Sequence, residues 1–299
     1  MIDSASPRVL LGHGTENDFV VLPDPDGEAW PESRLDADLV RRLCDRRAGL
    51  GGDGVLRVVR SRHVPDAPAV LGEALPRCEW FMDHRNADGS YAEMCGNGIR
   101  LYLHALLVEG LLDRAAAEAG VLVGTRGGPR WVGARPDGGY WVDMGPAVPL
   151  GLSEARISGV AHPGRGVSMG NPHLVCLTDV EVDNLDLSAL SGVDPEMFPD
   201  GVNVEMVNVL AAEDAPAGTA AHIRLRVYER GVGETRSCGT GACAAAYAAL
   251  EAGGRNAGTV AVEVPGGRLT VEFDGTTTVL SGPAVVVAAG VLSPEWLAG

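Results

Sequence analysis

Two cysteines are the residues of this chain most able to do chemistry. Cys95 and Cys238 each open a Cys-Gly-x-Gly turn, which follows a polar loop and precedes an apolar stretch. A cysteine at a helix start is expected to titrate closer to neutrality than its ordinary pKa of about 8.5, so one can serve as base and the other as acid. Inverting a carbon stereocentre through a carbanion needs both, one on each face. We therefore predict that Cys95 and Cys238 are an acid/base pair.

A single cysteine beside glycines is more often only a small buried residue in a tight turn. Two matching turns, nearly half the chain apart, argue instead for a duplicated functional unit. A redox pair that links Cys95 to Cys238 on oxidation remains an alternative. The cysteines outside this motif are expected to be structural, namely Cys44, Cys78, Cys176 and Cys243.

The predicted helix starts also offer a place for an anion. The first N–H groups of a helix have no acceptor within it, and the helix dipole adds positive potential there. A substrate carboxylate could bind at such a start, where the charge that accumulates as an α-proton leaves would be stabilised.

Polar side chains near turns and strand ends could bind the rest of an amino acid. Carboxamides suit a zwitterion because they donate and accept without adding a charge, although a loop asparagine more often serves only its own turn. His173 and Glu229 could orient or deprotonate the thiols, and Arg230 could pair with a second carboxylate. The candidate carboxamides are Asn17, Asn86, Asn97, Asn171 and Asn203.

Composition excludes several classes of protein. The net charge of −16 argues against nucleic-acid binding and favours a small-molecule partner. All 24 cationic residues are arginine, so neither a pyridoxal-phosphate Schiff base nor a P-loop lysine is possible. Zinc-type spacings such as C-x-x-C and H-E-x-x-H are absent. We expect no cofactor and no metal.

The run Gly49-Leu-Gly-Gly-Asp-Gly54 matches the dinucleotide pattern G-x-G-x-x-G. That fingerprint requires a strand before it and a helix after it, whereas here a helical stretch comes first and a strand second. The run is therefore interpreted as the turn that follows a helix.

Short strands dominate the predicted secondary structure, and two helices are expected at residues 99–112 and 242–251. The duplication predicts two lobes with a cleft: residues 1–145, to which 284–299 would return, and residues 146–283. The expected strands are residues 55–60, 141–144, 222–229, 260–264, 269–273 and 284–290.

The N-terminus lacks the basic region of a signal peptide, and no stretch is long enough to span a membrane, so a cytoplasmic location with reduced thiols is expected.

Four segments resemble the cofactor-independent diaminopimelate epimerases, and the likeness runs over nearly the whole chain. They are His13-Gly-Thr-Glu-Asn-Asp-Phe19, Asn86-Ala-Asp-Gly-Ser-Tyr-Ala-Glu-Met-Cys95-Gly-Asn-Gly98, Gly170-Asn-Pro-His173 and Glu229-Arg-Gly-Val-Gly-Glu-Thr-Arg-Ser-Cys238-Gly-Thr-Gly-Ala-Cys243.

The resemblance implies an α/β (α+β) fold of two pseudo-symmetric lobes, each an antiparallel barrel-like β-sheet around a central helix, with the site in the cleft between them. It implies interconversion of LL- and meso-2,6-diaminopimelate, in lysine and peptidoglycan precursor synthesis, by a homodimer. Cys95 and Cys238 would be the catalytic thiols, assisted by His173 and Glu229. Gly96-Asn97 and Gly239-Thr240 would hold the reacting carboxylate. The substrate would be fixed by Asn17, Asn86, Asn171, Asn203, Glu229 and Arg230.

Two positions depart from the family pattern: Glu16 stands where glycine is usual, and Gly54 where some members have glutamine. A proline or hydroxyproline racemase of the same fold is the nearest alternative, although a compact ring would not need the distal cluster around Arg230. A non-catalytic amino-acid-binding protein is the alternative from another class.

Overall fold

The computed structural model describes residues 7–298, which divide into two compact units. The first unit comprises the chain up to Val142 together with the segment from Pro283 onward, and the second is Asp143–Gly282. Strands outnumber helices in both units, and the predicted α/β class is confirmed. Within the described range, no helix is long and apolar enough to cross a membrane.

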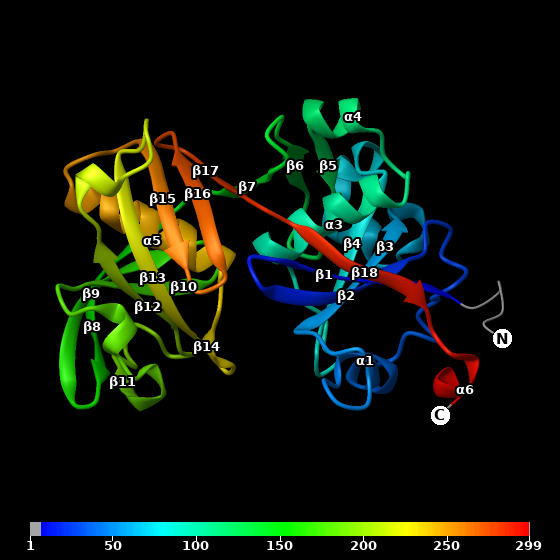
Figure 1. The fold of residues 1–299 in the computed structure, drawn as a ribbon, viewed down its shortest axis with the longest axis horizontal. Coiled ribbons are helices and arrows are strands. Elements are labelled where there is room, and N and C mark those ends of the chain that lie inside the picture. Colours follow the sequence, from blue (N-terminus) through cyan, green and yellow to red (C-terminus); the bar gives the residue numbers. More distant parts are fainter. Residues whose placement is uncertain (1–6, 299) are drawn as a thin grey trace. The chain divides into compact units, whose positions relative to one another are not determined.

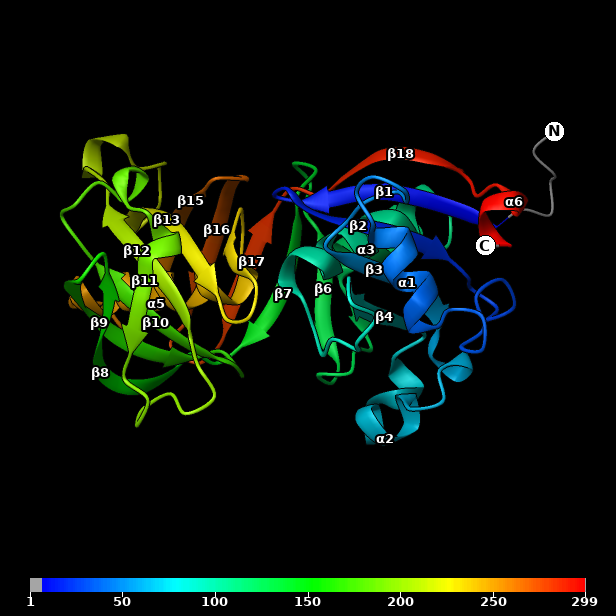
Figure 2. The ribbon, with the colours of Figure 1, turned by 90° about the horizontal axis from the view of Figure 1, so that it is seen from below.

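The first unit is built on a five-stranded sheet in the order β18-β1-β2-β3-β4 (Figure 1). β18, from the C-terminal end of the chain, lies antiparallel beside β1 at the sheet edge (Figure 2). β5, β6 and β7 form an antiparallel meander that does not belong to this five-stranded sheet. The strands are β1 (Arg8–Gly14), β2 (Asn17–Pro23), β3 (Gly54–Arg60), β4 (Trp80–Asn86), β5 (Val121–Val123), β6 (Arg130–Ala134), β7 (Tyr140–Gly145) and β18 (Val285–Val291).

Side chains of β2 point alternately to the two faces of this sheet, and each face packs against a helix. Val20 and Leu22 point into a core shared with α1, whereas Phe19, on the opposite face, reaches Gly98 in α3. α3 is buried along most of its length and contacts β1, β2, β3 and β18. The helices of this unit are α1 (Ala37–Cys44), α2 (Ala67–Leu71), α3 (Gly96–Val108), α4 (Arg114–Ala119) and α6 (Pro294–Leu297).

The second unit wraps its strands around one helix, α5 (Gly239–Ala252), as Figure 1 shows. The alanine-rich sequence of α5 buries nearly the whole helix, because small side chains let strands approach it from several sides. The strand order is β11-β8-β9-β10-β12-β13-β15-β16-β17, with β14 beside β13. The strands are β8 (Val148–Ile157), β9 (Val160–Ser168), β10 (Pro172–Leu177), β11 (Leu190–Val193), β12 (Asn203–Val209), β13 (Ala221–Glu229), β14 (Gly233–Thr235), β15 (Gly258–Val264), β16 (Gly267–Phe273) and β17 (Thr278–Gly282).

Three strand pairs differ from the expected antiparallel arrangement. β2–β3, β10–β12 and β13–β15 are parallel, so the sheets of both units are mixed. The β10–β12 pair matters for the candidate site, because it aligns His173 with Asn203 at the start of the two strands.

Both cysteine-led helices start earlier than the sequence suggested, directly after Cys95 and Cys238. α3 also ends earlier, at Val108, because Gly110 turns the chain with a positive φ of 65°. The expected strands all occur. The glycine run lies between α1 and β3, which confirms that it is not a dinucleotide fingerprint.

Candidate active site

Cys95 is the N-cap residue of α3. Its backbone is extended (φ −139°, ψ 120°), and its sulfur accepts a hydrogen bond from the Gly98 N–H at 3.3 Å. The side chain is half-buried. The cysteine therefore occupies the position where serine or aspartate usually caps a helix, which places the sulfur in the positive potential of the helix start.

Asn17 lies beside this sulfur. Its Oδ1 is 3.5 Å from Cys95 Sγ and 3.4 Å from Asn97 Nδ2, while its own Nδ2 donates to Asp53 Oδ2 at 2.7 Å. Asp53 thereby fixes the orientation of the Asn17 amide, with the oxygen toward Cys95. Neither residue could be linked to the other from the sequence, because Asn17 starts β2 whereas Asp53 lies 36 residues further on, directly before β3.

The side chain of Asn97 is fully buried, and its Oδ1 accepts from Arg100 Nη2 at 3.0 Å. This hydrogen bond joins two side chains of the first turn of α3 and stabilises that turn. Any contact of Asn97 with a ligand would therefore use its backbone at the helix start.

The two family departures have structural explanations. Thr15 and Glu16 form the tight connection between β1 and β2 with φ of 51° and 60°, the left-handed conformation that glycine adopts most readily. The hairpin thus keeps its geometry with glutamate in that place. At Gly54, an added Cβ would lie 2.5 Å from the Arg85 carbonyl oxygen, so a longer residue does not fit without a shift of β3. Asn86, opposite Gly54, is exposed and donates to Ser90 Oγ at 3.0 Å.

Cys238 caps α5 in the same way as Cys95 caps α3. Its backbone is extended (φ −124°, ψ 118°), and its sulfur accepts from the Gly241 N–H at 3.4 Å. Thr240 Oγ1 also lies 3.4 Å from this sulfur. The residue is only 7% exposed.

The expectation of a lowered pKa was wrong for Cys238. Burial raises the pKa of this thiol well above its ordinary value, and the carboxylates of Glu229 and Glu205 raise it further. Hydrogen bonds from Thr240 and the Gly241 N–H act in the opposite direction and do not compensate. The surroundings of Cys238 thus favour the thiol, which is the form required of an acid.

His173 is fully buried and links several predicted residues to Cys238. Its Nε2 lies 3.1 Å from Asn171 Oδ1, and Asn171 Nδ2 donates to Thr240 Oγ1 at 3.4 Å. On the other side of the ring, Nδ1 lies 2.6 Å from Glu205 Oε1. Glu205 was not predicted. The only signal for it was a lone carboxylate within the apolar strand VNVEMVNV, two residues after Asn203 and hence on the same face.

Glu229, Arg230 and Asn203 form a second group in this unit. Glu229 ends β13, accepts a hydrogen bond from Thr235 Oγ1, and acts on the thiol of Cys238 through its charge. Asn203 Oδ1 accepts from the Arg230 N–H at 2.9 Å. The Arg230 side chain is exposed and donates through Nη1 to the Asp200 carbonyl oxygen at 2.9 Å.

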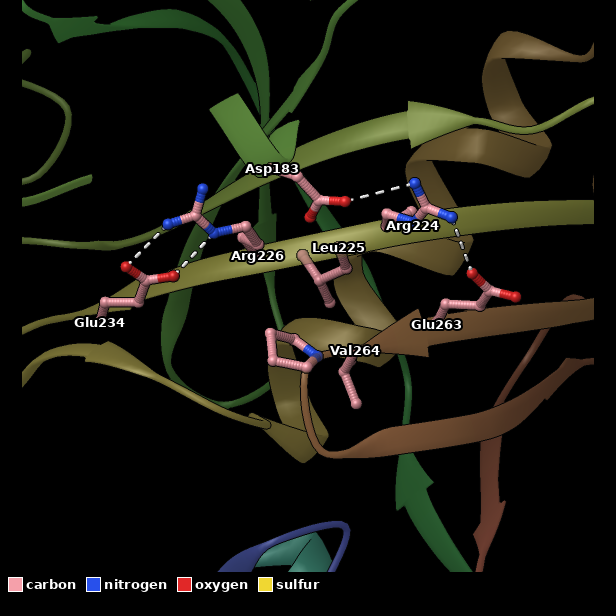
Figure 3. A pocket seen from close by; sticks show the side chains of 8 residues that line it. Asp183, Arg224, Leu225, Arg226, Glu234, Glu263 and Val264 are labelled. Atoms are coloured by element: carbon pink, nitrogen blue, oxygen red, sulfur yellow. Dashed lines mark hydrogen bonds and ion pairs between the residues drawn. The ribbon is translucent and has the colours of Figure 1, made fainter. Parts of the chain in front are cut away.

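A separate pocket of about 470 Å³ lies over β13 and β15 and contains none of the predicted site residues (Figure 3). Its two arginines are already neutralised: Arg226 pairs with Glu234, and Arg224 pairs with Asp183 and Glu263. An anionic ligand would have to displace these carboxylates, so this pocket is a surface network of ion pairs.

The arrangement in each unit is thus a helix start that carries a cysteine, with Asn17 beside the sulfur of Cys95 and Thr240 beside that of Cys238. Over residues 7–298, no cluster of three or more histidine, cysteine, aspartate or glutamate side chains could hold a metal ion. The second unit differs from the first by the histidine and two glutamates close to its thiol.

The family model for diaminopimelate epimerase matches residues 9–150 and 166–287 of the chain. Diaminopimelate epimerase of Thermobifida fusca is 52% identical over 95% of this chain and 97% of that protein. The enzyme of the same name from Rhodococcus jostii is 48% identical over 96% of this chain and 98% of that protein.

Solved structures share the fold at low sequence identity. A probable proline racemase from Agrobacterium radiobacter, with bound carbonate, superposes with a TM-score of 0.63 at 16% identity, covering 98% of this chain and 96% of that one. A phenazine biosynthesis protein of the PhzF family from Bacillus anthracis gives a TM-score of 0.59 at 17% identity, covering 96% and 99%. At these identities the likeness shows the fold alone.

Proposed function

Because the chain belongs to the diaminopimelate epimerase family, we propose that it interconverts LL- and meso-2,6-diaminopimelate by two-base proton transfer at the α-carbon. The observation that carries the proposal is the repeated helix start, in which Cys95 and Cys238 occupy the same capping position of α3 and α5. Family membership supports this substrate, and the two caps support this chemistry.

In this mechanism one cysteine, as thiolate, removes the α-proton, and the other, as thiol, returns a proton to the opposite face. One S–H bond forms and one breaks, so the total number of protons on the two thiols is unchanged and their roles are exchanged. The high pKa of Cys238 supports its resting role as the thiol. Cys95 would then be the group that starts as base.

The charge that develops on the substrate needs a nearby positive potential. In our proposal, the reacting carboxylate binds at the helix starts formed by Gly96-Asn97 and Gly239-Thr240, where backbone N–H groups and the helix dipoles stabilise it. The residue types support this, because glycine at the first helical position leaves the backbone open to close approach. Asn17, Asn86, Asn171 and Asn203 would bind the remaining polar groups, with Glu229 and Arg230.

The surroundings of His173 and Glu229 support a different role for each. Glu229 acts on the thiol of Cys238 through its charge, whereas His173 reaches it only through Asn171 and Thr240. We assign Glu229 to the control of thiol ionisation and His173 to the support of the substrate-binding amide of Asn171. A place in lysine and peptidoglycan precursor synthesis, a cytoplasmic location and a homodimer complete the proposal, and they rest on the family resemblance.

Substrate choice gives the test of this function. Reduced protein in D₂O is expected to exchange the α-hydrogen of LL-diaminopimelate and produce the meso form, and to leave L-proline unchanged, when both are followed by NMR and chiral chromatography. Exchange of proline alone would replace the proposal with a proline racemase. Exchange of neither would favour an amino-acid-binding protein.

A further inference from the structure

Glu205 is a charged residue in an unusually closed environment. It lies within β12, is 0% exposed, and its Oε1 is 2.6 Å from Nδ1 of an equally buried His173. Among the described residues, its Oε2 has no hydrogen-bond partner. Burying a carboxylate with only one of its two oxygens hydrogen-bonded lowers the stability of the fold, so the presence of Glu205 in this strand calls for a role.

Glu205 stands at the inner end of a series of contacts that leads to a thiol. From His173 the series continues through Asn171 and Thr240 to Cys238, at distances of 3.1, 3.4 and 3.4 Å. Glu205 is also close to the helix start itself, because a Cβ added at Gly241 would lie 2.7 Å from its Oε1. Removing Glu205 would therefore release the ring and alter the charge next to the capped sulfur.

The protons of the buried pair can be counted. A net-neutral pair is favoured because both side chains are withdrawn from water. Such a pair holds two protons, one between Glu205 Oε1 and His173 Nδ1 and one on Nε2, which then donates to Asn171 Oδ1. The Asn171 amide donates onward to Thr240, and the Thr240 hydroxyl is left to donate to the sulfur of Cys238.

The groups around Glu205 and His173 also favour a pair that holds two protons. Burial raises the pKa of Glu205, and the carboxylate of Glu229 raises it further, while His173 opposes both. If the pair loses its shared proton, it becomes an anion close to Cys238 and opposes formation of a second anion there. The other titratable group near Glu205 is Cys176, whose pKa is raised to about 12 mainly by burial.

We propose that Glu205 is a positioning residue for the Cys238 half of the reaction: it holds the His173 ring and so directs the hydrogen bonds that end at the Cys238 sulfur, while its own charge outweighs them and opposes ionisation of this cysteine. The inference deepens the proposed epimerase function and rests on it for the identity of the reacting thiol. The ionisation of Cys238 can, however, be measured without substrate.

The test compares Glu205→Gln with the full-length wild-type chain and a matched control, Glu263→Gln. Glu263 also faces a histidine, with its Oε1 3.1 Å from His222 Nε2, but it lies in the ion-pair network of Figure 3. Labelling of Cys238 by methyl methanethiosulfonate is followed from pH 6 to 11 by peptide mass spectrometry. The midpoint is expected to move to lower pH by about half a unit or more in Glu205→Gln, because a glutamine–histidine pair cannot lose a shared proton and become an anion beside the thiol, and to stay unchanged in Glu263→Gln.

An unshifted midpoint in folded Glu205→Gln would overturn the proposal. Glu205→Asp provides a second test, because it keeps the charge but is one methylene too short to hold His173. This variant is expected to lose 10- to 100-fold in kcat with KM within about twofold. Wild-type kcat in Glu205→Asp would equally contradict the positioning role. Since the labelling needs no substrate, it decides on Glu205 even if diaminopimelate is not turned over.

Discussion

Replacing either Cys95 or Cys238 by alanine is expected to abolish epimerisation of diaminopimelate, with a loss of at least about 10³-fold in kcat. Each variant keeps one acid/base group but lacks the second. Both stereoisomers should be affected, because each direction of the reaction uses both groups.

The alanine variants should remain folded. Each loses the sulfur that accepts from the Gly98 or Gly241 N–H, which costs about 1 kcal/mol as for other N-cap replacements. Circular dichroism and thermal unfolding check this point. Cys243→Ala is the matched control, since Cys243 is buried within α5 but does not cap it, and its activity should stay near wild type. Full activity in either capping variant would contradict the two-base account.

Arg230→Ala is expected to lower kcat/KM for diaminopimelate by at least about 100-fold, or roughly 2.7 kcal/mol, mainly through KM. The exposed guanidinium would pair with the distal carboxylate, which does not react, so its loss weakens the ground state and the transition state alike. Initial rates over a range of substrate concentrations separate the two parameters.

Arg156→Ala is the control for this experiment, because Arg156 belongs to the same unit but pairs with Glu154 on β8. Its kinetic constants should not change. An unchanged KM in Arg230→Ala would show that the distal end of the substrate is recognised elsewhere, and would remove the main argument against a smaller substrate.

The sequence predicted the class of fold and the strands well, because apolar alternation and glycine punctuation are local signals. The helix starts were misplaced because glycine disfavours a helix interior. In the first turn, however, glycine costs little, and a cysteine sulfur can cap the N–H groups there. The parallel pairing of β10 with β12 had no local signal, since it joins segments about thirty residues apart.

The candidate site was predicted unevenly for the same reason. The cysteines stand in distinctive turns. Asp53 and Glu205, in contrast, reach their partners Asn17 and His173 only after distant parts of the chain come together in the fold. The direction of the Cys238 pKa was also misjudged. A helix start lowers a thiol pKa, but burial and two neighbouring carboxylates outweigh that effect, and neither can be read from the motif.

The isotope content of the first products tests the two-base claim most directly. Unlabelled LL-diaminopimelate is incubated with the protein in D₂O, and substrate and product are separated before about a tenth has reacted. The two-base mechanism predicts deuterium at the inverted α-carbon of nearly every meso product, because that hydrogen comes from a second thiol already exchanged with solvent, while the remaining LL substrate keeps its original hydrogen. Meso product that retains the original hydrogen would show that one group both removes and returns the proton, and would contradict the account.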